Sequence, residues 1–314
     1  MKGNMQNVNN SSSNITSMST ENQVSAWLLS FCFLLGFPGN IVVVVIIIRY
    51  FKKDNFTLHL MLSLAVSDIL CLISLPLWIY SLNFEWIFSR GLCKFLFILI
   101  FTSMYSSVLT VTLMSVYRYL VVLHRSQWAK LGRKGERVLL CCLWTLALIL
   151  SSPVMAKANV VVKGQGHHCW RISGLDQESL AILLCEILLG FVLPFSIMAS
   201  FYFCLHKKVN QTTFFSNPRL ARLVTTIILT FVILWFPVHV INLVKVLAIA
   251  FKSTNPSVSE KLIGFWNVSS NIVNSLTFLN SCVNPLLYVC TFRLLFQKSE
   301  KQDRAGTSTL DSRL

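Results

Sequence analysis

The stretch LVTTIILTFVILWFP at residues 223–237 decides the fold class of this chain. It contains no charged residue, and predominantly apolar sequence continues beyond it to Val244. The hydrocarbon core of a bilayer is crossed by a helix of roughly 20 predominantly apolar residues. This stretch therefore predicts a membrane-spanning helix.

Similar runs recur along the 314 residues, of which 54% are hydrophobic and only 12% charged, about half the charge of a typical soluble protein. The least apolar run is the last, because it begins with Asn267, Asn271 and Asn274. Polar side chains at that depth must face the interior of a bundle. We expect an all-α bundle of seven transmembrane helices over residues 24–290, with helices at 24–49, 57–81, 93–124, 136–157, 179–206, 219–250 and 262–290.

The charges predict the orientation of the bundle. The net charge is +15, but the basic residues are scattered between apolar runs rather than gathered in one basic domain, which argues against a nucleic-acid partner. Cytoplasmic loops of membrane proteins are enriched in Lys and Arg. With an extracellular N-terminus, the cytoplasmic side receives Arg49, Lys52, Lys53, Arg125, Lys130, Arg133, Lys134, Arg137, Lys207, Lys208, Arg219, Arg222, Arg293, Lys298, Lys301, Arg304 and Arg313.

Residues 1–23 are rich in Asn and Ser and lack the apolar segment of a signal peptide, which predicts a disordered extracellular tail. Asn9, Asn10 and Asn14 each begin an N-x-Ser/Thr glycosylation sequence. Of the ten cysteines, only Cys93 and Cys169 fall outside the membrane on the oxidising side. They predict one disulfide, which ties the third helix to the loop between the fourth and fifth.

Each predicted helix also carries a polar, aromatic or proline landmark. In order these are Gly39-Asn40, Asp68, Tyr117-Arg118-Tyr119, Trp144, Pro194, FVILWFP at 231–237 and NPLLY at 284–288. One landmark per helix, in this order, resembles rhodopsin-like G-protein-coupled receptors over the whole chain. The resemblance implies a receptor rather than an enzyme, located in the plasma membrane, with a heterotrimeric G protein as its partner.

Asp68 is a carboxylate at membrane depth and is therefore a candidate functional residue in its own right. An all-oxygen environment suits a hard cation. The resemblance implies a small hydrated cavity that holds an allosteric sodium ion, and no other cofactor is expected. Its residues are Asp68, Ser107, Asn280, Ser281 and Asn284.

Prolines inside helices remove backbone hydrogen bonds and create hinge points, here Pro194, Pro237 and Pro285. The resemblance implies that Trp235 forms the floor of the ligand pocket and that Phe231 below it moves during activation. It also implies that Tyr202 and Tyr288 meet near Arg118 in the active state.

The family usually has Asp or Glu before Arg118, but this chain has Tyr117, and Asn217 offers no carboxylate either. An Arg without that partner loses a charge-assisted hydrogen bond. We therefore expect either elevated basal signalling or a resting state held by other contacts.

Two ligand classes are disfavoured by the sequence. Ile100 stands where amine receptors have an Asp, and Phe278 stands where opsins have the retinal-linking Lys. A rim of basic residues above an apolar bundle favours an anionic amphiphile. The rim consists of Lys94, Lys157, Lys163, Arg171, Lys245, Lys252 and Lys261, together with His167 and His168.

Four stretches are similar to leukotriene B4 receptors, in the chemoattractant branch: SMYSSVL at 103–109, CEILLGFVLPF at 185–195, RLVTTIILTFVILWFPVHVINL at 222–243 and NSCVNPLLY at 280–288. This similarity implies an eicosanoid carboxylate as ligand and coupling mainly to the Gi class. The implied ligand residues are Ser103, Met104, Tyr105, Glu186, His239, Asn242 and Asn271, with Trp235 beneath them.

The carboxylate anchors of those receptors are not matched. Phe97, Ala158 and Ser270 stand where the relatives tend to have His or Arg, and Lys157 is a candidate substitute. The alternative ligands are another hydroxy fatty acid or a chemoattractant peptide.

Two other protein classes fit poorly. A transporter would show two similar halves with matching broken helices, and an intramembrane enzyme would need acids or histidines at one depth. Residues 291–299 predict an amphipathic helix on the inner leaflet, in contact with membrane lipids. Serines and threonines in the cytoplasmic tail at 300–314 predict phosphorylation by a receptor kinase and binding of arrestin.

Overall fold

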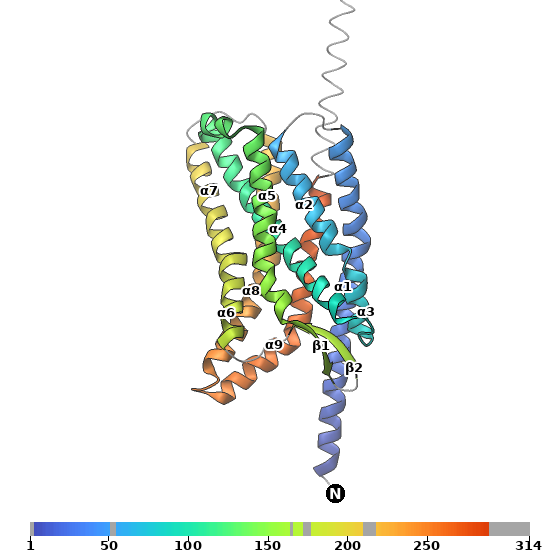
Figure 1. Cartoon of the computed structure of the whole chain (residues 1–314). Helices are drawn as coiled ribbons and strands as arrows, with labels where there is room; N and C mark the ends of the chain where they lie inside the picture. Colours follow the sequence, from blue (N-terminus) through green and yellow to red (C-terminus); the bar gives the residue numbers. More distant parts are fainter. Residues whose placement is uncertain (1–2, 51–54, 164–165, 172–176, 210–217, 289–314) are drawn as a thin grey trace, which may run out of the picture.

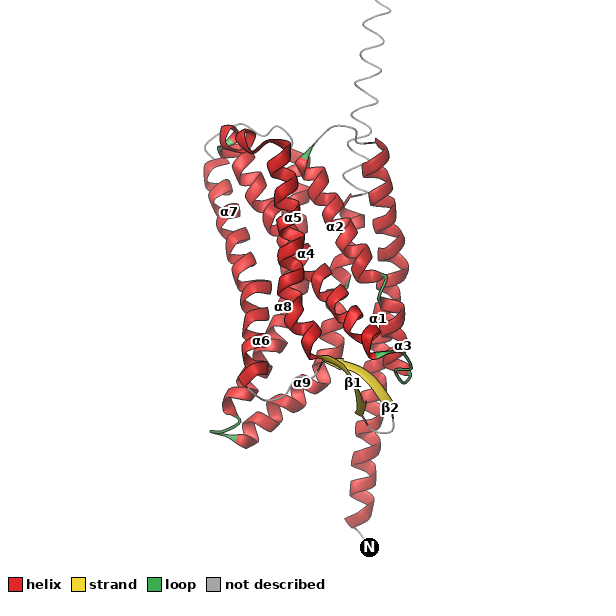
Figure 2. Cartoon of the chain, viewed as in Figure 1, coloured by secondary structure: helices red, strands yellow, loops and turns green. Residues whose placement is uncertain are grey.

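The computed structural model describes residues 3–50, 55–163, 166–171, 177–209 and 218–288. They form a bundle of long helices that run roughly parallel or antiparallel (Figure 1), with one short hairpin as the only strands among these residues (Figure 2). The predicted helix at 291–299 and the tail at 300–314 lie outside the described residues. The helices are α1 (Gly3–Tyr50), α2 (Phe56–Leu72), α3 (Leu75–Asn83), α4 (Arg90–Leu123), α5 (Arg125–Lys157), α6 (Gln177–Ile187), the π-helix η1 (Leu188–Val192), α7 (Leu193–Val209), α8 (Pro218–Phe251) and α9 (Pro256–Thr277).

The seven predicted spans are present, but three of them are interrupted. The second consists of α2 and α3, with Pro76 in the first turn of α3. The fifth consists of α6, η1 and α7, and the π-helical turn ends where the backbone N–H of Leu193 donates to the carbonyl of Leu188. Pro194, which was predicted as a hinge point, follows immediately and has no N–H to donate. The seventh consists of α9 and a further helical stretch at 279–288.

Six helical segments among the described residues are long and apolar enough to cross a membrane. The seventh, α9 with residues 279–288, is not among them. Its polar residues explain this, as Asn271, Asn274 and Ser275 line an internal cavity rather than the lipid surface.

Helix α1 is longer than expected. It begins at Gly3, and its first part projects beyond the bundle (Figure 1). The composition of residues 1–23 predicted a tail without regular structure instead. No Gly or Pro occurs between Gly3 and Gly36, so nothing in the covalent structure interrupts a helix there.

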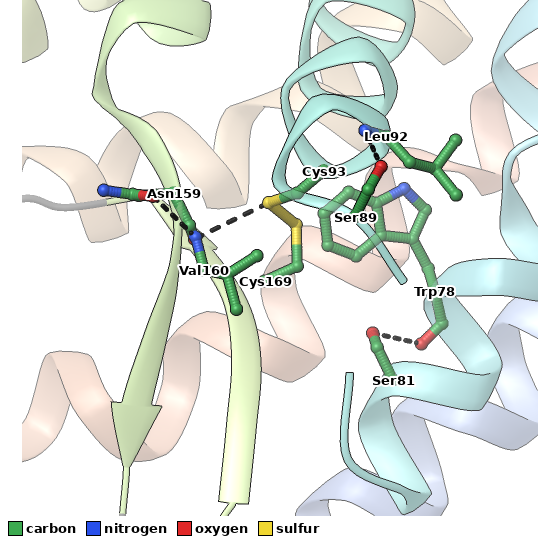
Figure 3. Close-up of a disulfide and its surroundings, with 8 residues drawn as sticks. All are labelled: Trp78, Ser81, Ser89, Leu92, Cys93, Asn159, Val160 and Cys169. Carbon is green, nitrogen blue, oxygen red and sulfur yellow. Dashed lines mark hydrogen bonds between the residues drawn. A yellow bond between two sulfur atoms is a disulfide. The ribbon is translucent and has the colours of Figure 1, made fainter. Parts of the chain in front are cut away.

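An antiparallel hairpin covers one end of the bundle, at the end from which the N-terminal part of α1 projects (Figure 1). It consists of β1 (Ala158–Lys163) and β2 (Gly166–Arg171), with Val160 opposite Cys169. Cys169 forms the predicted disulfide with Cys93 in the first turn of α4 (Figure 3). The backbone N–H of Trp86 also donates to the carbonyl of His167 at 2.7 Å. The hairpin is therefore tied both to the first turn of α4 and to the loop that precedes it.

The other half of the bundle has a tightly packed interior. Phe231 and Tyr288 are the largest fully buried side chains among the described residues. Near the middle, Gly36 lets α1 approach its neighbours closely, because a Cβ there would lie 2.8 Å from Leu72 Cδ1 and 2.9 Å from Cys282 Sγ. The described residues of this half are thus closely packed.

Candidate ligand-binding and signal-transmission sites

A cavity of about 630 Å³ lies beneath the hairpin. This volume is within the range of small-molecule binding sites, roughly 300–1,000 Å³. Side chains from α1, α3, α4, β2, α6, α8 and α9 line it, and most of them are apolar. Seven residues predicted to contact a ligand are among the lining residues: Met104, Tyr105, Glu186, Trp235, His239, Asn242 and Asn271.

Two predicted ligand residues are not among the cavity's lining residues. The hydroxyl of Ser103 donates to the carbonyl of Leu99 at 2.7 Å, within its own helix. Lys157, the proposed substitute for the missing anchors, forms an ion pair with Glu178 at 2.6 Å. The structure therefore places neither side chain where it would meet a ligand in the cavity.

The unmatched anchor positions lie in or next to the cavity. Phe97 and Ser270 line it, whereas Ala158 is buried at the start of β1. Phe97 packs edge-on against Trp78 with the ring centroids 5.1 Å apart. These positions contribute no positive charge to the cavity.

The positive charge comes instead from Arg171 and Lys245. Arg171 pairs with Glu186 through two contacts, Nη1 to Oε1 at 2.5 Å and Nη2 to Oε2 at 3.3 Å. Lys245 is only 4% exposed, and its Nζ lies 3.8 Å from the centroid of the Trp266 ring. Both residues belong to the basic rim noted in the sequence, but the sequence alone did not separate the cations that enter the cavity from those that face solvent.

Several polar atoms at the cavity wall have no hydrogen-bond partner among the described residues. They are the indole N–H groups of Trp78, Trp235 and Trp266 and both ring nitrogens of His239. A buried polar group without a partner costs about 1–3 kcal/mol. A ligand with hydroxyl or carboxylate oxygens would satisfy such groups.

An aromatic column leads from the cavity into the packed half of the bundle. Phe231, Trp235 and His239 follow one another at four-residue intervals on one face of α8, with ring centroids 5.3 and 5.9 Å apart. Phe191 of η1 stacks on His239 at 4.6 Å. Pro237 lies within this part of α8. A ligand that contacts Trp235 would therefore lie close to Pro237, the hinge point predicted from the sequence.

The predicted sodium residues gather below the cavity. Asp68 is completely buried and accepts a hydrogen bond from Asn284 Nδ2 at 2.8 Å, and Ser281 lies beside the carboxylate. Its second oxygen, Oδ1, has no hydrogen-bond partner among the described residues. Ser107, Asn280 and Ser281 line a neighbouring cavity of about 10 Å³, roughly the space of one water. A buried carboxylate oxygen next to hydroxyl and amide oxygens fits a hard cation such as sodium.

The contact of Arg118 was not foreseen from the sequence. Its Nη1 donates to the hydroxyl of Thr225 on α8 at 3.0 Å. Tyr117 points elsewhere and packs against Trp128 and Phe56, with ring centroids 4.8 and 5.1 Å away. In this structure a hydroxyl and an aromatic cluster thus stand in the place of the acid that the resemblance leads one to expect.

The tyrosines expected to meet near Arg118 have different surroundings. Tyr202 is 42% exposed, whereas Tyr288 is completely buried in the core with Phe231. Their meeting in the active state stays a prediction. Pro285 lies in the helical stretch 279–288, and its ring would lie 3.0 Å from a Cβ at Gly39, so this stretch packs closely on α1.

Comparison with known proteins places these features in one family. The profile described as "7 transmembrane receptor (rhodopsin family)" matches residues 39–288. The chain is 33% identical to leukotriene B4 receptor 1 of Homo sapiens over 84% of this chain and 75% of that protein. It is 30% identical to the C3a anaphylatoxin chemotactic receptor of Oncorhynchus mykiss, over 88% of this chain and 77% of that protein.

A third relative, C-C chemokine receptor type 1 of Homo sapiens, is 27% identical over 83% of this chain and 74% of its own length. Members of the family bind extracellular ligands and couple to G proteins, and they are not enzymes. The seven-helix fold and the receptor class expected from the sequence are confirmed. The chain is a multi-pass membrane protein that belongs to the rhodopsin family of seven-transmembrane receptors, among its chemoattractant-type members.

Proposed function

We propose that this protein is a plasma-membrane receptor for an anionic lipid mediator of the leukotriene B4 type and that it signals through heterotrimeric G proteins of the Gi class. The cavity under the hairpin carries this proposal. It is large, mostly apolar, and contains two cations and one carboxylate among its described lining residues. Such a site buries a hydrocarbon chain and attracts an acidic end group.

The unpartnered donors in the cavity support a hydroxylated ligand. The N–H groups of Trp78, Trp235 and Trp266 and the ring nitrogens of His239 are spread over different parts of the wall. A site built to bond hydroxyls discriminates strongly against analogues that lack them, because its polar groups are then left unpaired. Similarity to leukotriene B4 receptor 1 supports the same ligand class.

The topology proposed with this function has the N-terminus outside the cell and carrying the sequons at Asn9, Asn10 and Asn14. The hairpin and the cavity then face the extracellular side, and the end with Arg118 faces the G protein. We also propose that a sodium ion at Asp68 stabilises the resting state, and that a receptor kinase and arrestin act on the cytoplasmic side.

Dose–response curves test the ligand class. Cells that express this chain are exposed to leukotriene B4, to other hydroxy fatty acids and to formyl peptides, and inhibition of cyclic AMP accumulation is measured. The proposal expects a saturable response to leukotriene B4 that untransfected cells lack. If only another hydroxy fatty acid evokes a response, the ligand is still an anionic lipid but it is not leukotriene B4.

A peptide ligand is the second candidate, because relatives of this chain include a receptor named for the C3a anaphylatoxin and a chemokine receptor. Glu186, a carboxylate on the cavity wall, could pair with a basic peptide side chain. A response to peptides with none to the lipids would establish this alternative.

A further inference from the structure

The three charged residues on the cavity wall form one electrostatic group. Arg171 lies on β2, Glu186 on α6 and Lys245 on α8, and all three line the same cavity. One carboxylate faces two cations, so the described wall carries one excess positive charge. A monoanion would complete the balance.

Arg171 is held in place from three directions. It pairs with Ala158 in the register of the hairpin and lies two residues after Cys169, whose disulfide ties β2 to α4. Its guanidinium carbon lies 5.7 Å from the centroid of the Phe101 ring, within the range of a cation–π contact. Glu186 then fixes the direction of the guanidinium through the two contacts described above.

Burial makes this arrangement sensitive to a ligand's charge. The side chains of Arg171 and Glu186 are 20% and 11% exposed, and Lys245 is almost fully buried. Electrostatic interactions are stronger here than at the surface because solvent screens them less. Arg is also suited to two acceptors at once, since its planar group carries five N–H donors.

We propose that Arg171 and Lys245 together bind the anionic headgroup of the ligand, a monocarboxylate, and that Glu186 is a built-in counter-ion that positions Arg171 rather than a contact of the ligand. This inference rests on the proposed lipid ligand and goes beyond it by assigning the anchor. Arg171 and Lys245 thus take the role that the sequence suggested for Lys157, which pairs with Glu178 and does not line the cavity.

The test uses the purified receptor in detergent and two probes, leukotriene B4 and arachidonic acid, each compared with its methyl ester. Dissociation constants come from ligand-induced thermal stabilisation. The ratio of ester to acid dissociation constants measures carboxylate recognition and is insensitive to general loss of apolar contacts. For the unaltered receptor we expect the acids to bind at least about tenfold more tightly than the esters.

Variants then assign the recognition to residues. Arg171→Gln and Lys245→Gln should each lower the acid preference, Arg171→Gln by about tenfold. Glu186→Gln should raise the affinity for the acids roughly threefold or more, because Arg171 is retained while a negative charge is removed from the cavity wall. The other ion pair supplies matched controls, since Lys157→Gln and Glu178→Gln should leave the acid preference unchanged.

A double variant separates the loss of an anchor at Arg171 from repulsion of the ligand by the Glu186 carboxylate. Arg171→Gln alone leaves the Glu186 carboxylate without this partner, and that charge could itself repel an acid. In Arg171→Gln/Glu186→Gln the repulsion is gone, so the acid preference stays low only if Arg171 binds the headgroup. Recovery of the preference would overturn the inference.

Other outcomes would overturn it as well: equal binding of acids and esters to the unaltered receptor, a loss of acid binding in Glu186→Gln as large as in Arg171→Gln, or dependence on Lys157. Failure of the proposed function is distinguishable. If leukotriene B4 evokes no G-protein response while both acids still bind through Arg171, the leukotriene ligand is wrong and the anchor stands. If none of the four probes binds, both proposals are wrong.

Discussion

Arg118 on α4 and Thr225 on α8 are 107 residues apart in the sequence, yet Arg118 Nη1 donates to the Thr225 hydroxyl at 3.0 Å. This hydrogen bond connects two helices whose relative position changes on activation in the mechanism that the family resemblance implies. Arg118 is followed by Tyr119, which packs edge-on against Phe201 of α7 at 4.9 Å. Arg118 and Tyr119 thus connect α4 to α8 and to α7.

Removing the Thr225 hydroxyl should raise basal signalling. Thr225→Val keeps the side-chain shape but cannot accept the hydrogen bond from Arg118. A hydrogen bond to a charged group contributes about 1.5–3 kcal/mol when well buried, and part of that should shift the population toward the active state several-fold. Basal cyclic AMP inhibition measures the shift, with Thr225→Ser as the control that keeps the hydroxyl. Equal basal signalling in the two variants would show that the hydrogen bond between Thr225 and Arg118 does not restrain activation.

Tyr117→Asp should restore an acidic partner next to Arg118 and lower basal output. The same change removes a ring from the cluster with Phe56 and Trp128, so we also expect a loss of stability, on the order of 1–3 kcal/mol. Basal signalling is compared at matched surface expression. Tyr117→Phe retains the ring and serves as the control. Unchanged basal signalling in Tyr117→Asp would show that the missing acid does not set the resting level.

Sodium should weaken agonist affinity in this receptor if an ion at Asp68 favours the resting state. Asp68→Asn keeps the size of the side chain and removes its charge, so agonist affinity should become insensitive to sodium. Agonist binding is measured in sodium and in N-methylglucamine buffers of equal ionic strength. Ser63→Ala is a control, because Ser63 lies on the same helix but bonds to Thr110 and Trp144 instead. If sodium does not change the agonist affinity of the unaltered receptor, the proposed ion site at Asp68 is wrong.

Cys93→Ser and Cys169→Ser should each destabilise the receptor and weaken ligand binding by a similar amount. The disulfide closes a loop with a sequence separation of 76, and loss of such a bond costs about 2–4 kcal/mol. Arg171 would lose its tether at the same time. Thermal inactivation and ligand affinity are the measurements, and the double variant should match the single ones. Cys185→Ser, at an exposed cysteine, is the control.

The seven helices were predictable because their signal is local. A bilayer demands a predominantly apolar run for each span, and six of the seven runs are visible without knowing their neighbours, whereas the seventh carries Asn267, Asn271 and Asn274. Two of the three interruptions lie next to a proline, Pro76 or Pro194, and of these two only Pro194 was named as a hinge point from the sequence. The landmark residues then identified the family, and Cys93 and Cys169 were recognisable because the remaining cysteines lie within the predicted helices.

The partners of the charged residues were decided by the tertiary structure. Lys157 and Arg171 are both basic residues at the rim of the bundle, and no local pattern tells them apart. Yet Lys157 pairs with Glu178, while the disulfide-tied strand β2 carries Arg171 into the cavity beside Glu186. Likewise, the sequence does not distinguish Thr225 from the other threonines of its apolar helix. Only the packing of α8 near Arg118 gives Thr225 its hydrogen bond. Helical periodicity is set by the backbone of one segment, whereas a charge contact depends on how closely separate segments approach, and that is a property of the folded bundle alone.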